Sequence, residues 1–249
     1  MDTQEKELYV AILIAVAVIA AILVFFIVSI IRQQKRYRLL TRQKIKAEIT
    51  TLENERRRIA ADLHDEVGPL LSAVKLQINN IEGAGEEETA IISKSSTHID
   101  DIIRRMREIS NDLLPNVLVR KGLSAAIQDF IGKVKTATPM KIDFQHTAIN
   151  RFDTSLEVNM YRIAQEIIHN SIKHAGAAHL NIRLQMKEGM LLLSTEDDGK
   201  GFDYEEIRNT KGGLGLLNLQ SRTEVMGGEF SFESGKGKGT KYLFEIPLQ

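Results

Sequence analysis

The chain of 249 residues contains no cysteine, which excludes disulfide bonds, thiolate nucleophiles and cysteine-ligated zinc. It also lacks an excess of charge, because 33 basic residues balance 33 acidic ones. A net charge near zero argues against direct binding to nucleic acid. The length allows one or two domains. The absence of cysteine fits a cytoplasmic location for the folded part of the chain.

Charged residues are missing altogether from Leu8 to Ile31, a run of 24 residues. As an α-helix this run would span roughly 36 Å, more than the bilayer's hydrocarbon core of about 30 Å. The segment therefore predicts a transmembrane helix. A cleaved signal peptide is the alternative, and it fits less well because the run is too long and the residues before it are mainly acidic.

Basic residues follow this span with no acidic residue until Glu48: Arg32, Lys35, Arg36, Arg38, Arg42, Lys44 and Lys46. The positive-inside rule then places the C-terminal bulk in the cytoplasm and the N-terminus outside. We expect residues 1–7 to lie outside, too few for a ligand-binding domain. The signal must then come from the bilayer, from a membrane or periplasmic partner, or through the helix itself.

Apolar residues recur in helical steps from Ile45 to Ile81 and predict one continuous helix. Residues 32–54 contain no glycine or proline, so the transmembrane helix should continue through them as a coiled-coil linker. Gly83-Ala84-Gly85 then interrupts the pattern, and a second helix resumes near Thr89. The resulting hairpin would bury its apolar stripe by dimerising into a four-helix bundle. The alternative is a monomer whose hairpin packs on its own second domain.

The second half of the chain has a different pattern of apolar residues. After Leu113-Leu114-Pro115 an amphipathic helix should run to about Lys135. Alternating apolar residues then predict strands at 141–145, 179–187, 190–197, 229–233 and 241–246, with helices at about 156–174 and 215–226. Helices with mainly antiparallel strands predict an α+β sandwich.

His64 stands out within the segment E-R-R-R-I-A-A-D-L-H-D-E-V-G-P, residues 55–69. It lies just off the apolar stripe, so its ring can face solvent. A neutral imidazole nitrogen can attack phosphorus, and the neighbouring carboxylate of Asp65 can hold the tautomer and balance the developing charge. A helix-surface histidine without chemistry is the alternative. Other histidines lack this context, and we expect them at the surface: His98, His146 and His179.

Two polar motifs of the second half suggest a nucleotide site. In E-I-I-H-N-S-I-K-H, Glu166, Asn170 and Lys173 share one helical face and suit Mg²⁺ together with phosphate. In D-D-G-K-G, Asp197 ends an apolar strand, where a carboxylate can reach the exocyclic amine of a base. Taken singly, the first could be an exposed polar face and the second a simple turn.

Glycine gathers in two further segments, K-G-G-L-G-L at 211–216 and G-K-G-K-G-T at 235–240. Glycines before a helix let backbone N–H groups approach phosphates, where the helix dipole also favours negative charge. Neither segment matches a Walker loop or a Rossmann fingerprint.

In this order, the motifs resemble the N, G1 and G2 boxes of the Bergerat-type ATP-binding fold shared by histidine kinases, gyrase, Hsp90 and MutL proteins. Together with the segment around His64, the chain resembles a bacterial sensor histidine kinase of the NarX/DesK-like subfamily. The likeness is carried by L-H-D, by L-L-P ahead of G-L-S-A-A-I, and by Y-R-I-A-Q-E-I-I-H-N-S-I-K-H-A. It implies a homodimeric, inner-membrane enzyme that phosphorylates His64 with ATP and passes the phosphoryl group to an aspartate of a response regulator.

The resemblance also implies roles for single residues. His64 would accept phosphate, and Asp65 would orient or deprotonate it. Asn170 would hold Mg²⁺, Glu166 would position the ligand shell, and Asp197 would bind the adenine amine. Further nucleotide contacts are implied for Lys173 and His174 near the phosphates, Gly199 and Gly201 beside the base, Gly213, Gly215 and Leu216 at a short lid over residues 202–212, and Gly239 and Thr240 behind the base pocket.

The predicted domains are an outer N-terminus (1–7), a transmembrane helix (8–31), a linker (32–54), a dimerisation and phosphotransfer domain (55–115) and an ATP-binding catalytic domain (116–249). Two other functions fit parts of the pattern. One is a membrane-tethered ATPase or serine kinase of the same superfamily, which would not need His64. The other is a pseudokinase, a membrane-anchored scaffold that binds ATP without transferring phosphate.

One position departs from the subfamily. Its members usually carry Gln or Asn five residues after the phosphorylated histidine, where the amide can position a water for dephosphorylating the regulator. Here that residue is Pro69, preceded by Gly68. Proline cannot donate a helical hydrogen bond, so we expect a loosened helix one turn after His64 and weak phosphatase activity. The alternative is a tolerated kink, with Glu66 or another side chain positioning the water.

Overall fold

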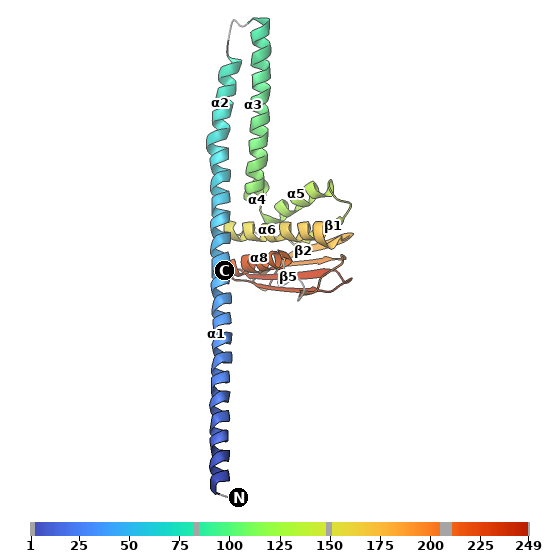
Figure 1. Ribbon diagram of the computed structural model, residues 1–249. Coiled ribbons are helices and arrows are strands. Elements are labelled where there is room, and N and C mark those ends of the chain that lie inside the picture. Colours follow the sequence, from blue (N-terminus) through green and yellow to red (C-terminus); the bar gives the residue numbers. More distant parts are fainter. Residues whose placement is uncertain (1–2, 82–84, 148–150, 205–210, 249) are drawn as a thin grey trace. The chain divides into compact units, whose positions relative to one another are not determined.

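The computed structural model describes residues 3–81, 85–147, 151–204 and 211–248, and the chain divides into two units, Met1–Ala47 and Glu48–Gln249. Helix α1 (Thr3–Asp62) is continuous over 60 residues (Figure 1). It contains a segment long and apolar enough to cross a membrane, and the large apolar side chains between Leu13 and Ile31 are exposed. Exposed apolar side chains on every side of a helix are typical of a segment that packs against lipid.

His64 lies where the helix changes its winding. Between α1 and α2 (Gly68–Asn79), the segment η1 (Leu63–Val67) forms a π-helical turn, in which the N–H of Gly68 donates to the carbonyl oxygen of Leu63. Pro69 has no N–H to donate, and its ring would clash with a carbonyl in regular α-helical position. The wider turn relieves this conflict. A loosened turn is therefore present, but it spans Leu63–Val67 and includes His64, where the prediction placed it one turn later.

The predicted hairpin is formed by α2 and α3 (Glu86–Leu113), although Gly83 and Ala84 of its expected turn lie outside the described residues. Three glutamates occupy the first turn of α3, where the helix dipole favours negative charge. Lys75 pairs with Asp100 across the hairpin, with 2.7 Å between Nζ and Oδ1. A Cβ on Gly68 would lie 3.3 Å from Cε of Met106, so glycine lets the two helices approach closely just after His64.

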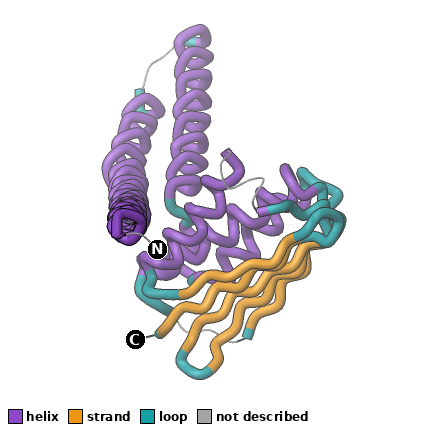
Figure 2. The backbone as a smooth tube through the Cα atoms, turned by 60° about the horizontal axis from the view of Figure 1, so that its bottom comes forward, coloured by secondary structure: helices purple, strands orange, loops and turns teal. Residues whose placement is uncertain are grey.

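The second half forms a five-stranded sheet in the order β1-β2-β3-β5-β4, covered on one face by helices (Figure 2). Strands β1 and β2 are parallel, and the other neighbours are antiparallel. The α+β prediction is confirmed, and the strand bounds agree with the predicted ones within one residue. The elements are α4 (Asn116–Lys121), α5 (Leu123–Lys135), β1 (Lys141–His146), α6 (Thr154–Asn170), η2 (Ser171–Ala175), β2 (His179–Lys187), β3 (Met190–Asp197), α8 (Lys211–Val225), β4 (Glu229–Ser234) and β5 (Thr240–Pro247).

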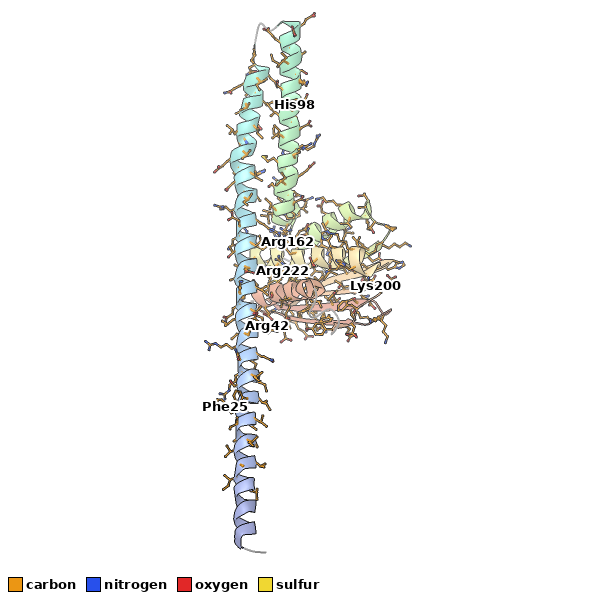
Figure 3. All side chains as sticks on the ribbon, in the orientation of Figure 1. Phe25, Arg42, His98, Arg162, Lys200 and Arg222 are labelled. Atoms are coloured by element: carbon orange, nitrogen blue, oxygen red, sulfur yellow. The ribbon has the colours of Figure 1, made fainter. Side chains whose placement is uncertain are left out.

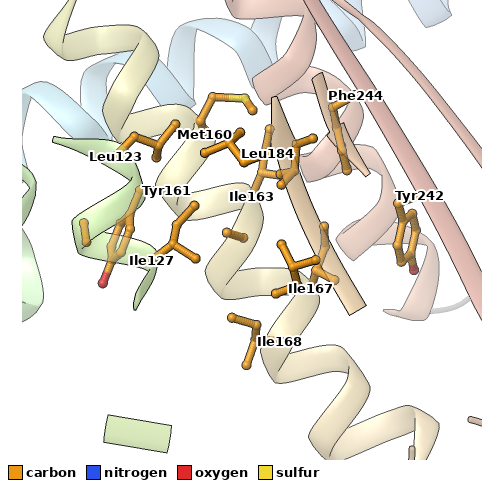
Figure 4. Close-up of a cluster of buried hydrophobic side chains, with 14 of the residues drawn as sticks. Leu123, Ile127, Met160, Tyr161, Ile163, Ile167, Ile168, Leu184, Tyr242 and Phe244 are labelled. Atoms are coloured by element: carbon orange, nitrogen blue, oxygen red, sulfur yellow. The ribbon is translucent and has the colours of Figure 1, made fainter. Parts of the chain in front are cut away.

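Every second side chain along the central strands is buried, and these side chains form the core. In β3, the side chains of Leu191 and Leu193 are buried while their neighbours are half-buried or exposed. They face α6, whose Ile163 and Ile167 pack in the same buried cluster (Figure 4). Each fully buried aliphatic side chain contributes about 1.5–3 kcal/mol relative to exposure. This packing fixes α6 on the sheet and so fixes the polar residues at its C-terminal end.

Candidate nucleotide-binding site

A pocket of about 350 Å³ lies where α6 ends, β3 ends, β5 begins and α8 begins. These elements are far apart in the sequence, and the core brings their ends together. Eight residues predicted to bind nucleotide or metal line it: Glu166, Asn170, His174, Asp197, Gly201, Gly215, Leu216 and Thr240. The volume and the mixed lining are typical of a small-molecule site.

Asp197 is the buried acid of this pocket, with 5% of its surface exposed. The backbone N–H of Gly199 donates to its Oδ1 (3.0 Å), and the hydroxyl of Ser171 donates to its Oδ2 (3.4 Å). Burial raises the pKa of Asp197, and these hydrogen bonds partly oppose that rise. A fixed, buried hydrogen-bond acceptor at the wall of a pocket suits the exocyclic amine of adenine.

Two glycines allow the backbone to pass close to Asp197. A Cβ on Gly199 would lie 2.5 Å from Cβ of Ala175. Gly239 has φ +70°, and a Cβ there would collide with the carbonyl oxygen of Asp197. Neither glycine lines the pocket, so both shape it from behind. Their predicted role beside a base pocket stays a prediction.

Glu166 and Asn170 meet one turn apart on α6, where Nδ2 of Asn170 donates to Oε1 of Glu166 (3.1 Å). Within the described parts of the chain, no hydrogen bond is formed by Oδ1 of Asn170. A neutral oxygen beside a carboxylate fits Mg²⁺, which takes one or two protein ligands and completes its shell with water and phosphate oxygens. The described residues contain no cluster of three His, Cys, Asp or Glu for a metal held by protein alone.

Some predicted residues lie elsewhere. Lys173 is exposed in η2 and does not line the pocket. Gly213 lies in the first turn of α8, and the predicted lid over 202–212 is largely outside the described residues. The pocket also includes residues that spacing did not indicate, although Lys200 and Ser171 fall inside the motifs: Ser171, Ala175, Lys200, Phe202 and Tyr242.

His64 and Asp65 are both exposed in η1, and neither lines the pocket. Within the described residues no hydrogen bond joins them, so the proposed orienting role of Asp65 stays a prediction. His64 and the pocket are therefore separate in this conformation. The histidines expected at the surface are exposed: His98, His146 and His179.

Models of known protein families match segments in both halves of the chain. The family model described as histidine kinase matches residues 55–118, and the model described as histidine kinase-, DNA gyrase B- and HSP90-like ATPase matches residues 155–249. The histidine kinase domain of the blue-light activated histidine kinase EL346 of Erythrobacter litoralis has a TM-score of 0.48 and 19% identity, covering 79% of this chain and 94% of that one.

Two relatives are similar over most of this chain. The oxygen sensor histidine kinase NreB of Staphylococcus carnosus (strain TM300) is 28% identical over 222 residues, which are 86% of this chain and 62% of NreB. The sensor histidine kinase ComP of Bacillus subtilis (strain 168) is 30% identical over 208 residues, 79% of this chain and 27% of ComP. The chain thus spans less than two thirds of either relative. Taken with the family matches, these similarities show that the chain belongs to the histidine kinase family, in its NarX-like subfamily.

Proposed function

We propose that this chain is a membrane-bound sensor histidine kinase, which phosphorylates its own His64 from ATP and Mg²⁺ and passes the phosphoryl group to an aspartate of a response regulator. One observation carries the proposal. A single pocket gathers Asp197, Asn170 and Glu166, while the exposed His64 lies in a distorted helical turn of the same chain. A base ligand, a metal ligand and a separate nucleophile are the parts that phosphoryl transfer requires.

Each of these residues has its own role in the proposed phosphoryl transfer. Asp197 would accept a hydrogen bond from the adenine amine. Asn170 would hold Mg²⁺ through its amide oxygen, and the metal would supply positive charge to neutralise the phosphates. A neutral ring nitrogen of His64 forms a bond to the γ-phosphorus as the bond from that phosphorus to the bridging oxygen of ADP breaks. The proton on the other ring nitrogen can then pass to Asp65 or to water.

Dimerisation is supported by the apolar side chains that the hairpin leaves exposed. Leu70 is 65% exposed and Ile109 is 55% exposed, both on helices that pack together in the hairpin. A second copy of the hairpin would cover this surface in a four-helix bundle. Further exposed members of the stripe are Leu52, Ile59, Val67, Val74, Ile81 and Ile102.

The first half of α1 supports a location in the inner membrane of a bacterium. Its large apolar side chains from Leu13 to Ile31 are exposed, and a basic stretch follows them. With the basic stretch in the cytoplasm, the catalytic residues face cellular ATP and the regulator. The stimulus then reaches α1 from the bilayer or from a membrane or periplasmic partner.

The test is labelling of the full chain, in lipid nanodiscs, with γ-labelled ATP. We expect label that is lost in acid and kept in alkali, as for phosphohistidine, and no label on the His64→Gln variant. The His98→Gln variant, changed at an exposed histidine of α3, serves as the matched control and should label normally. Alkali-labile, acid-stable label would indicate a serine kinase. ATP binding without label would indicate a pseudokinase.

A further inference from the structure

Helix α1 carries a row of residues at intervals of seven, which is the spacing of a coiled-coil seam. Leu52 and Ile59 belong to this row and are exposed, as expected for residues that meet a second copy of the chain. Arg38 is the only charged member of the row, which reads Val24, Ile31, Arg38, Ile45, Leu52 and Ile59. One cation therefore interrupts an otherwise apolar seam, shortly after the apolar segment ends.

A companion row, three residues ahead of the first, completes the seam of a two-stranded coiled coil. It contains Val28, Lys35 and Arg42, so the seam is basic at three successive positions, 35, 38 and 42. Figure 3 labels Phe25 in the apolar part of α1 and Arg42 in the basic part. In a parallel dimer each seam residue faces its own copy. Like charges would then meet at three consecutive levels, which opposes the close approach of the two helices.

The two helices offer no acidic side chain that could neutralise this charge. The sequence holds no acidic residue from Leu8 to Ala47, and in a parallel dimer the second copy presents the same residues at the same level. Within the described part of the chain, Lys35 is exposed and takes part in no salt bridge. The counter-charge for the first basic level of the seam therefore has to come from outside the two helices.

The surface of the bilayer lies close enough to supply that counter-charge. Measured along the helix axis from Ile31, the last residue of the uncharged run, Lys35 lies roughly 6 Å away, Arg38 roughly 10 Å and Arg42 roughly 16 Å. The headgroup layer on each side of a bilayer is about 5–8 Å thick. Long basic side chains can reach back toward it by several ångströms. Lys35 and Arg38 are therefore within reach of lipid phosphates, whereas Arg42 lies beyond them.

We propose that Lys35 and Arg38 of two copies form a binding site for the headgroups of anionic phospholipids, and that the occupied site lets the two α1 helices close where they leave the bilayer. The inference rests on the membrane location and the dimer of the proposed function. A lipid phosphate accepts charge-assisted hydrogen bonds from both ammonium and guanidinium groups. A zwitterionic headgroup carries an ammonium of its own and adds no net negative charge, so it leaves the repulsion in the seam in place.

The lack of cysteine in the chain allows a test with one spin label per copy. Gln43→Cys places the label at an exposed, uncharged position of α1, outside both rows. The distance between the two labels of a dimer is measured by electron paramagnetic resonance, with the full chain in nanodiscs of phosphatidylcholine with or without phosphatidylglycerol. We expect a short, narrow distance distribution with phosphatidylglycerol and a longer, broader one without it. Spin-labelled lipids should associate with about fivefold or greater preference for phosphatidylglycerol, the effect of one basic residue at a membrane surface.

Two double variants of the labelled chain separate the seam from basic charge in general. Lys35→Gln combined with Arg38→Gln removes the repulsion, so the short distance should appear in both kinds of nanodisc. The matched control combines Arg32→Gln with Arg36→Gln, which removes as much charge from the same exposed stretch but outside both rows. The control should keep the dependence of the distance on lipid.

Three results would overturn the proposal. The first is a parental distance that is the same in both kinds of nanodisc, and the second is a control that behaves like the seam variant. The third is closure in phosphatidylcholine on addition of inorganic phosphate, which would assign the site to a soluble anion. The readout is a distance between labels and needs no phosphorylation. Absence of phosphohistidine would therefore refute the kinase function and leave these distances to decide the inference.

Discussion

The hydroxyl of Ser171 donates to Oδ2 of Asp197, so the residue directly after the proposed magnesium ligand supports the proposed adenine ligand. Ser171 is 1% exposed and opens the π-helical turn η2. A second π-helical turn, η1, contains His64. Single π-turns within α-helices are frequent at functional sites, because the extra residue re-aims nearby side chains. Both ends of the proposed reaction therefore lie in distorted helix.

The first prediction concerns Asp197→Asn. The variant loses the charged acceptor for the adenine amine, which should weaken ATP binding by about 1.5–3 kcal/mol, roughly tenfold to a hundredfold in Kd. Stability should move the other way. The pKa of Asp197 is raised in the folded protein above its ordinary 3.8, so stability falls as pH rises between these two values. At neutral pH the neutral Asn should therefore raise Tm. Calorimetry measures both effects.

Its neighbour Asp198 supplies the control. Asp198 is half exposed, and the backbone N–H groups of Ala178 and His179 both donate to its Oδ1. The bond from His179 is the main cause that lowers the pKa of Asp198. A lowered pKa contributes stability above the ordinary value, and this is lost as pH falls through the folded one. Asp198→Asn should keep ATP affinity and should not raise Tm. Equal behaviour of the two variants would contradict the assignment of Asp197.

The second prediction concerns the metal. Asn170→Ala removes the amide oxygen proposed for Mg²⁺ and should lower the autophosphorylation rate by roughly tenfold or more, at least the usual effect of outer-shell partners. Because Asn170 would be only one of the ligands that hold Mg²⁺, excess Mg²⁺ should recover part of the rate. Sedimentation should show an unchanged dimer, since Asn170 lies in the pocket and not on the hairpin. Rates equal to those of the parent at every Mg²⁺ concentration would exclude the ligand role.

The third prediction concerns topology. A reporter that is active only in the cytoplasm, fused after Gln249, should be active, because seven basic residues follow the apolar segment. A reporter that is active only in the periplasm should be silent at the same position. Activity of the periplasmic reporter would reverse the proposed orientation.

Local patterns predicted most of the fold. The burial of Leu191 and Leu193 in β3 follows from strict alternation, and the bounds of β2 and β3 agree with the prediction. The pocket could also be predicted, because most of the residues that line it belong to short motifs. In each motif the helix, strand end or glycine turn fixes where the polar side chains lie. Pro69 indicated the loosened turn, because a missing N–H is a property of the residue itself.

Contacts between distant segments could not be predicted in this way. Glu53 forms salt bridges with Arg162 and Arg222, which lie 109 and 169 positions further along the chain, and nothing local pairs them. On the helix Glu53 is one of several acids, and only the packing of α6 and α8 buries it. Ser171 could have been singled out as the neighbour of Asn170, but its bond to Asp197 depends on how β3 approaches α6.

The last prediction concerns removal of phosphate from the response regulator. Pro69 stands where the subfamily usually carries Gln or Asn, and its side chain has no group that can position water. The preceding Gly68 has no side chain at all, and it packs close to Met106. The turn with His64 is π-helical, so the ring is presented differently from one on a regular helix. We therefore expect a competent kinase with weak phosphatase activity.

To test this, the unphosphorylated full chain in nanodiscs is added to phosphorylated regulator with ADP and Mg²⁺. Regulator phosphate should decay about as fast as it does alone. Pro69→Gln should speed the decay by about a hundredfold, the lower end for a positioned acid–base group. The matched control is Pro69→Ala, which restores the backbone N–H without an amide and should leave the decay slow. Rapid decay with the parental chain would mean that Glu66 or another side chain positions the water, and that Pro69 matters only for the shape of the helix.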